Sequence, residues 1–381
     1  MRRSDARSED LRRALAALDA PALRALIEEL LPQLDDGART QLSRHVIERA
    51  AKAPSGPVPP AVSETEIDEV LAFVRRASRV SYTDPAEVDA LLSRGSDAFL
   101  RRDYTACRRL FAALLPPIGD VEIDLGQDQL PDEVLDIDLD ACAARHAVAV
   151  WMTSETDQRA TAIWHALRET ETVWFPDAPL HDMEREAMEP LPDLDRFLAA
   201  WIALLRTEIA AEQGGGWGGG PRAWLREAVE RAGGTSSLAE LARLSGDADD
   251  FRSWIGHLVR AEDWQATLAA CEEAAERAAD AYDRARFLDA AARCALELGR
   301  RDVAARLERA WLAEPLERRL LRWLGMARSR AALRARARKA LDACPKRHAR
   351  QRAVLQVLAG DLRAAAELLA AAPGGHWSDT E

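Results

Sequence analysis

The sequence predicts an all-α fold. Nearly every long segment places apolar residues at helical spacing, and the sustained period-2 alternation typical of strands is almost absent. Helix start signals stand where this periodicity begins. The stretches between them are rich in proline, glycine or acidic residues, which indicates connecting segments.

The N-terminal part carries the clearest local signals. Residues 9–31 place leucines on helical faces. Ser63 followed by Glu66 is a capping box, in which each side chain bonds the backbone of the other residue. The pair Asp84-Pro85 is a second start signal. We therefore expect helices to begin just after Ser63 and Asp84.

Two breaks divide the chain into two helical units. The stretch APSGPVPPAV at 53–62 cannot continue a helix because proline lacks a backbone donor, and the glycines of QGGGWGGGP at 213–221 make a helix there costly. The predicted organisation is an N-terminal helical segment (1–52), a Pro-rich linker (53–63), a helical unit (64–212), a Gly-rich linker (213–221), C-terminal helical repeats (222–373) and a flexible tail (374–381).

Four short turns share one pattern. In residues 93–117, the small residue Gly95 precedes the turn Asp103-Tyr104, and a second apolar face containing Phe111 follows. The turn is echoed at Asp263-Trp264 and in residues 298–315 and 358–373. This pattern resembles the tetratricopeptide repeat, in which small residues let two antiparallel helices approach and aromatic residues fill the gap between neighbouring pairs.

The resemblance implies a function as well as a fold. Tetratricopeptide-like pairs stack into a curved α-solenoid, whose extended groove holds peptides or partner proteins. The layout also resembles the helical region that accompanies SWIM-type zinc fingers in some bacterial proteins. Their zinc motif, CxC followed later by Cys-x-His, is absent because no two cysteines here are near each other, so no metal is implied.

Composition favours a cytoplasmic location. Hydrophobic residues make up 48% of the chain and charged residues 30%, as in soluble folded proteins. No window approaches the run of about 18 apolar residues that a membrane helix requires, so we expect no membrane partner. The N-terminus lacks the apolar region of a secretory signal. Five scattered cysteines, an odd number, favour reduced thiols in a cytoplasm.

No motif for chemistry is present. None of the seven histidines stands at a metal-ligand spacing, and no CxxC occurs. Neither a phosphate-binding glycine loop nor a GxSxG nucleophile motif appears. We therefore predict no catalytic residue, no metal and no cofactor, and a protein that is not an enzyme. An enzyme assembled from scattered acids is the third-ranked alternative.

A basic stretch at 328–352 is the most unusual feature. Residues 317–352 contain 13 basic and two acidic residues, a net +11 in a chain of formal charge -12. Arginine is favoured by a GC-rich bacterial genome, which the scarcity of lysine indicates here, so a solvated outer helix is the simplest interpretation. Against it, no acid lies between 318 and 341 to form helical ion pairs. The predicted partner-binding residues are Arg330, Arg334, Arg336, Arg338, Lys339, Arg347 and Arg350.

An acidic segment at 119–140 is the candidate counter-surface. It holds nine acids and no basic residue, and its apolar residues indicate an ordered loop between two helices. The residues predicted to face a basic surface are Asp120, Glu122, Asp124, Asp132, Glu133, Asp136 and Asp138.

Three kinds of partner would supply negative charge to the basic stretch: an acidic protein or peptide, the segment 119–140 of this chain or of a second copy, or a nucleic acid. Outside 317–352 the chain carries -23, which would repel a polyanion. We therefore predict a non-enzymatic scaffold or adaptor that binds a protein or peptide partner, with self-association included. A nucleic-acid-associated factor that uses the helices at 328–352 is the alternative.

Overall fold

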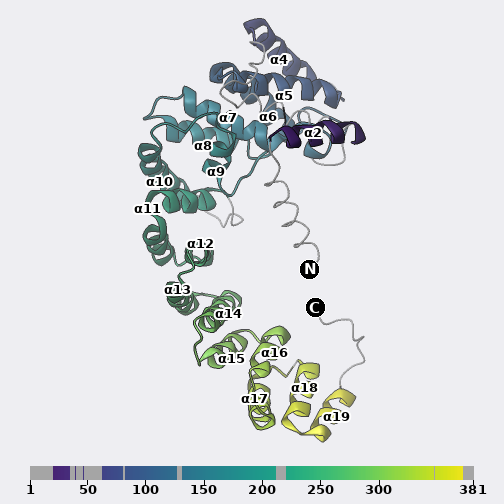
Figure 1. Cartoon of the computed structure of the whole chain (residues 1–381), viewed down its shortest axis with the longest axis vertical. Coiled ribbons are helices and arrows are strands. Elements are labelled where there is room, and N and C mark those ends of the chain that lie inside the picture. The colour runs from purple at the N-terminus through teal and green to yellow at the C-terminus, as the bar shows by residue number, and fades with distance from the viewer. Residues whose placement is uncertain are drawn as a thin grey trace. The chain divides into compact units, whose positions relative to one another are not determined.

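The computed structural model describes residues 20–34, 39, 46, 62–79, 82–126, 131–211, 220–346 and 348–371. Helices are the only regular secondary structure in these residues, which confirms the all-α prediction (Figure 1). The chain divides into two compact units, Met1–Ala228 and Val229–Glu381. Most of both predicted linkers, and the whole predicted tail at 374–381, lie outside the described residues.

The first unit begins with capped helices. Ser63 and Glu66 form the predicted capping box, and the Asp84 side chain accepts a hydrogen bond from the Ala86 backbone at the start of the next helix. Both predicted starts are therefore confirmed. The described helices of this unit are α2 (Ala20–Leu30), η1 (Leu31–Gln33), α4 (Glu64–Ala77), α5 (Pro85–Leu100), α6 (Tyr104–Gly119), η2 (Pro131–Glu133), α7 (Leu139–Thr153), α8 (Arg159–Glu169), α9 (Pro179–Glu186), α10 (Leu194–Ala211) and the first residues of α11 (Pro221–Ser245).

Helix α7 is the centre of the first unit. It is buried without interruption from Ala141 to Trp151, and it contacts α5, α6, α8 and α9. A helix that is apolar all round must be covered on all sides, which explains this central place. In the neighbouring hairpin of α5 and α6, a Cβ at Gly95 would lie 2.6 Å from the Phe111 ring, so only glycine permits this approach.

Aromatic side chains fill the gaps among α7, α8, α10 and the start of α11. The ring centroids of Phe197 lie 4.2 Å from Trp151 and 5.6 Å from Trp201. Trp224 stacks on Trp201 and meets Trp164 edge-on at 5.9 Å. The first residues of α11 therefore belong to the core of the first unit. Most tryptophans here are core fillers.

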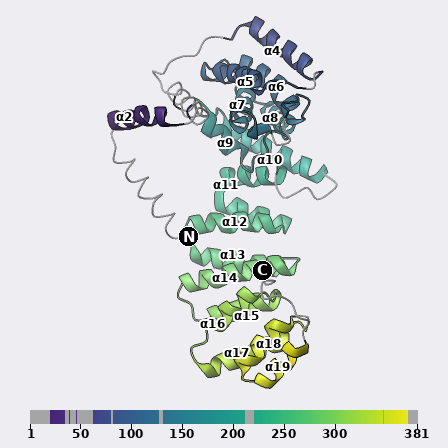
Figure 2. The same ribbon diagram turned by 90° about the vertical axis from the view of Figure 1, so that its right-hand side faces the viewer.

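After its first helix, the second unit is a succession of helices, each of which contacts the next (Figure 2). It begins inside α11, whose backbone is non-helical at Gly234 (φ 57°). Its remaining helices are α12 (Ala248–Arg260), α13 (Trp264–Arg277), α14 (Ala281–Glu297), α15 (Val303–Ala313), α16 (Glu317–Gly325), α17 (Arg330–Ala343), α18 (Ala349–Ala359) and α19 (Leu362–Ala371).

The four turns with a common sequence pattern also share a backbone geometry. In each, one residue adopts a positive φ, namely Arg102, Glu262, Gly299 and Gly360. The next backbone N–H bonds the carbonyl five residues earlier, at 2.9 Å from Asp103 to Ala98 and 3.1 Å from Asp263 to Leu258. This bonding is the Schellman arrangement, which satisfies the last carbonyls of a helix.

In three of these turns the next residue is an aspartate that caps the following helix. Asp103, Asp263 and Asp361 each accept a hydrogen bond from the backbone N–H three residues later. One short sequence thus ends a helix and starts the next. In the third turn the aspartate, Asp302, comes three residues after Gly299 and makes no side-chain cap, which matches its irregular spacing in the sequence.

Candidate binding surface

Ion pairs in the second unit follow a regular separation along the chain. Five of them join a helix to the helix two further on, and their partners lie 30 to 34 residues apart. We name this set the charge ladder: Arg243–Glu273, Arg252–Asp283, Glu272–Arg306, Asp289–Arg319 and Glu308–Lys339. The ladder thus links alternate helices of the second unit, from α11 to α17.

The most buried member of the charge ladder is Arg319. Its side chain is 1% exposed, and its Nε donates to Asp289 at 2.6 Å while its Nη1 bonds Glu314. A buried guanidinium is tolerated only when its charge is paired and hydrogen-bonded. Arg319 and Arg306, the two buried arginines of the ladder, are therefore structural.

The arginines in and just before the basic stretch do not continue the ion pairing of the charge ladder. In α16, in α17 and in the connection between them, the side chains of six exposed arginines form no ion pair or hydrogen bond with any described residue. We name them the basic surface: Arg318, Arg322, Arg328, Arg330, Arg334 and Arg338. Arg330, Arg334 and Arg338 were predicted as binding residues, whereas the other three were not.

The other predicted basic residues have different surroundings. Arg336 is half-buried, and its Nη1 donates to the Trp323 carbonyl at 2.8 Å. Lys339 pairs with Glu308 in the charge ladder. Arg350 is half-buried, and Arg347 lies outside the described residues. Arg336 and Lys339 thus hold α17 against its neighbours.

Arg330, Arg334 and Arg338 form one row along α17. Residues four apart on a helix lie about 6 Å apart along the axis, so three like charges are aligned at that interval. The Arg334 guanidinium lies next to the turn at Gly360, where an added Cβ would come within 3.7 Å of Nε. The row is an exposed array of donors with a fixed spacing.

The acidic segment is anchored in the first unit. Ile123, Leu125, Leu135 and Ile137 are buried, and the backbone N–H groups of Asp136 and Ile137 donate to the Asp89 carboxylate. No strand forms over 121–125, and residues 127–130 lie outside the described part of the chain. The apolar residues thus fix the segment and leave most of its acids outside.

The acids of this segment fall into two groups. Asp124 and Asp138 accept backbone hydrogen bonds from Gly126 at 2.7 Å and from Ala141 at 2.9 Å, so they stabilise local structure. Asp120, Glu122 and Glu133 are exposed, and their side chains form no ion pair or hydrogen bond with described residues. Asp136 is exposed as well, and the side chain of Asp132 lies outside the described residues.

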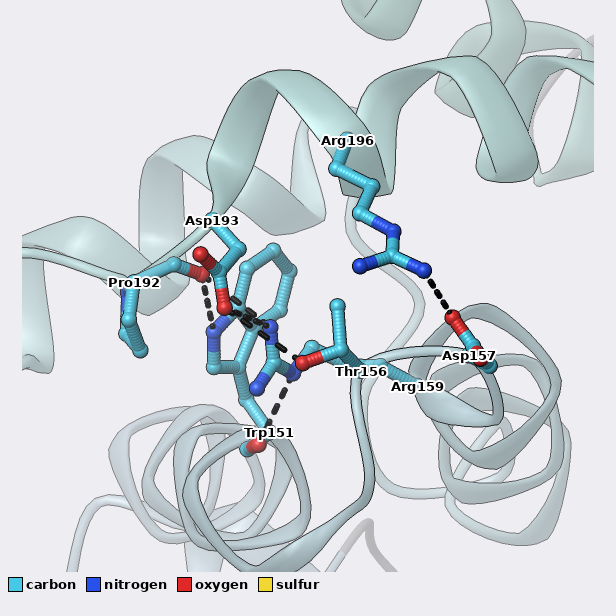
Figure 3. Close-up of polar contacts among 7 residues, drawn as sticks. All are labelled: Trp151, Thr156, Asp157, Arg159, Pro192, Asp193 and Arg196. Atoms are coloured by element: carbon cyan, nitrogen blue, oxygen red, sulfur yellow. Dashed lines mark hydrogen bonds and ion pairs between the residues drawn. The ribbon is translucent and has the colours of Figure 1, made fainter.

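A polar cluster around Arg159 is satisfied within the chain (Figure 3). Its guanidinium donates to the carbonyls of Trp151 and Pro192, each at 3.1 Å. Its Nη1 lies 3.6 Å from the Asp193 carboxylate, which also accepts from the Thr156 hydroxyl. The cluster ties the α7–α8 connection to the start of α10.

Features suited to chemistry are absent from the described residues. All five cysteines are buried thiols, and burial raises the pKa of Cys107 well above its usual value. No group of three or more metal-ligating side chains gathers in the described residues. The backbone N–H groups of Leu180 and His181 donate to the Glu227 carboxylate, which caps α9. His181 and Asp182 therefore lie in the first turn of α9.

Comparisons with known proteins do not assign this surface. The chain has no significant match to a protein-family model, a curated protein or a solved structure. Among the described residues, every helix is too short or too polar to span a bilayer.

Proposed function

We propose that this chain is a non-enzymatic helical-repeat scaffold that binds an acidic protein or peptide through the Arg330, Arg334 and Arg338 row. The observation that carries the proposal is the contrast between the charge ladder and the basic surface. In α11 to α15 the ladder arginines meet an acid of another helix, whereas the α17 row meets none among the described residues. Like charges in a row destabilise a helix by roughly 0.2–0.5 kcal/mol per pair, which a partner's carboxylates would remove.

The repeat character supports the scaffold part of the proposal. Contacts between consecutive helices are what a helical solenoid requires, and the four Schellman turns and the ion pairs 30 to 34 residues apart add a regularity along the chain that supports it. Solenoids expose long surfaces because each pair is covered only by its neighbours. Five buried thiols fit a reducing cytoplasm.

The spacing of the row favours an acidic helix as the partner. Carboxylates four residues apart on a helix repeat at the same interval of about 6 Å as the three guanidiniums. A guanidinium can bind a carboxylate with two parallel hydrogen bonds. An acidic helix lying along α17 would therefore meet all three arginines at once.

A nucleic acid is the less favoured partner. Single-stranded nucleic acids need exposed aromatic rings for base stacking as well as positive charge. Trp311 and Trp323 are fully buried and stack on each other at 5.7 Å, so neither offers a ring to a base.

The proposal predicts a difference between two probe peptides. One is a helical peptide with glutamate at every fourth residue, and the other carries glutamine there. Fluorescence anisotropy with the full chain should show tighter binding of the glutamate peptide. The triple variant R330E/R334E/R338E should weaken that binding about 10-fold, since three exposed ion pairs contribute together about 0.6–3 kcal/mol.

The matched control is R293E/R301E/R309E. These arginines are also exposed and unpaired among the described residues, and the change in net charge is the same. An equal loss of peptide binding in the control would show that only net charge matters. The row at Arg330, Arg334 and Arg338 would then have no specific role in binding. Tighter binding of RNA or duplex DNA than of the glutamate peptide, at physiological salt, would replace the proposal with the nucleic-acid alternative.

A further inference from the structure

The end of α6 presents an exposed valine between two free carboxylates. Val121 has φ 56° and is 60% exposed. A β-branched side chain rarely adopts this left-handed region, because its Cβ substituents crowd the backbone. The side chains of Asp120 and Glu122, on either side, form no ion pair or hydrogen bond with described residues. We name Asp120, Val121 and Glu122 the acidic tip.

The surrounding structure holds the acidic tip in this conformation. Ile118 and Ile123 are fully buried on either side of it, and the Ile123 backbone donates to the Pro117 carbonyl at 3.0 Å. A Cβ at Gly119 would lie 2.3 Å from the Thr172 hydroxyl, so the chain packs closely there. Strain that the surroundings maintain on an exposed residue is typical of functional sites.

Helix α16 exposes a surface with the opposite pattern. Arg318, Leu321 and Arg322 lie at positions i, i+3 and i+4, and therefore on one helical face. Leu321 is 55% exposed, and both arginines belong to the basic surface. An apolar residue thus lies beside two free guanidiniums, as Val121 lies beside two free carboxylates.

We propose that the Arg318, Leu321 and Arg322 face of one chain binds the acidic tip of a second copy. Val121 would cover Leu321, and the carboxylates of Asp120 and Glu122 would pair with the guanidiniums. The two surfaces differ, so the contact is heterologous: each bound copy still offers one free surface of each kind. This contact does not use the α17 row, and it therefore stands apart from the proposed function.

Such an interface is expected to be weak and sensitive to salt. Exposed ion pairs contribute about 0.2–1 kcal/mol each and are screened by ions, while one apolar contact adds a modest amount. The species to detect is an assembly at high protein concentration and low ionic strength. Sedimentation velocity should show a mass that rises with concentration above the 42.0 kDa of one chain and falls back when salt is added.

Complementary variants provide the decisive experiment. R318Q/R322Q removes one surface and leaves the acidic tip, and D120N/E122Q does the opposite. Each variant alone should remain at the mass of one chain. An equimolar mixture should form a dimer of twice 42.0 kDa and nothing larger, because only one productive contact exists per pair of chains.

Two controls guard against a general effect of charge. R301Q/R309Q and E276Q/E297Q change exposed residues that are unpaired among the described residues, with the same charge differences, and should self-associate like the unchanged chain. The α17 variant R330E/R334E/R338E should also keep its association. The proposal is overturned if the unchanged chain stays at the mass of one chain under these conditions, or if the complementary mixture does.

Discussion

At the scale of single residues, His146 is the buried group with the clearest consequence for pH. It lies in α7 with 2% of its surface exposed, and its Nδ1 has no hydrogen-bond partner among the described residues. Burial, with a smaller effect from the charge of Arg108, lowers the pKa of His146 to about 4. The imidazole is therefore neutral in the folded chain.

This low pKa makes the first unit sensitive to mild acid. In the unfolded chain the histidine takes up a proton below about pH 6.5, whereas the folded chain does not do so until about pH 4. The unfolded state binds more protons in this window, so stability falls as the pH falls through it. The loss should reach about 2 kcal/mol near pH 5.

The variant H146L tests this directly. Leucine keeps an apolar side chain in the α7 core and cannot be protonated, so the stability of H146L should decline less between about pH 7 and pH 5. Urea unfolding at several pH values measures the slope, with the exposed His181 changed to leucine as the control. The same slope for H146L and the unchanged chain would contradict the buried, neutral histidine.

At the scale of structural elements, the turns are the features that the sequence predicts best. Each turn is decided by residues within a few positions of one another, such as the small residues before Asp103 and the aspartate cap itself. The positive φ of Arg102 and Glu262 could not be predicted, because neither is a glycine or an asparagine. The Schellman bonds impose that conformation on residues that do not favour it.

Glu262 therefore offers a test of turn geometry. Its φ is 55°, and its side chain is exposed. Glycine adopts this region without steric conflict, so E262G should stabilise the second unit by about 1 kcal/mol. E262A is the matched control, because it removes the carboxylate and keeps Cβ. The urea midpoint should rise for E262G only; equal midpoints for the two variants would argue against strain at this turn.

At the scale of the whole molecule, local sequence signals predict the helices but not which charged side chains form ion pairs. Glu297 precedes Arg330 by 33 residues, a separation within the range of the charge ladder, yet α17 is three helices beyond α14 and no ion pair joins the two residues. Glu308 and Lys339, on helices two apart, do pair. Which face of a helix each residue occupies, and how the helices stack, decides the outcome.

The candidate surface was therefore predictable as a region and not residue by residue. Its location at 328–352 follows from composition, because arginines gather there without acids. Arg336 and Lys339 were predicted to bind a partner, but in the structure they contact Trp323 and Glu308 of the same unit. Arg318 and Arg322 were missed because they precede the basic stretch.

The charge ladder should also govern how cooperatively the second unit unfolds. In a repeat protein, stability depends on the contacts between neighbouring repeats as well as on each repeat. Arg319 of α16 is almost fully buried and pairs with Asp289 of α14, so the variant D289A leaves a buried charge with Glu314 alone. Removing one partner of a buried pair costs about 3 kcal/mol, whereas R319M, which removes the charge, should cost less.

Urea unfolding followed by tryptophan fluorescence would measure both the midpoint and the steepness of the transition. The tryptophans Trp311 and Trp323 lie in the same core as α16, so they report on this region. Because the Asp289–Arg319 pair joins α14 to α16, D289A should lower the midpoint and, on the proposed repeat architecture, also broaden the transition. E276A removes an exposed, unpaired acid of α13 and should do neither. If D289A unfolded as E276A does, the ladder would be a surface feature without a role in coupling the repeats.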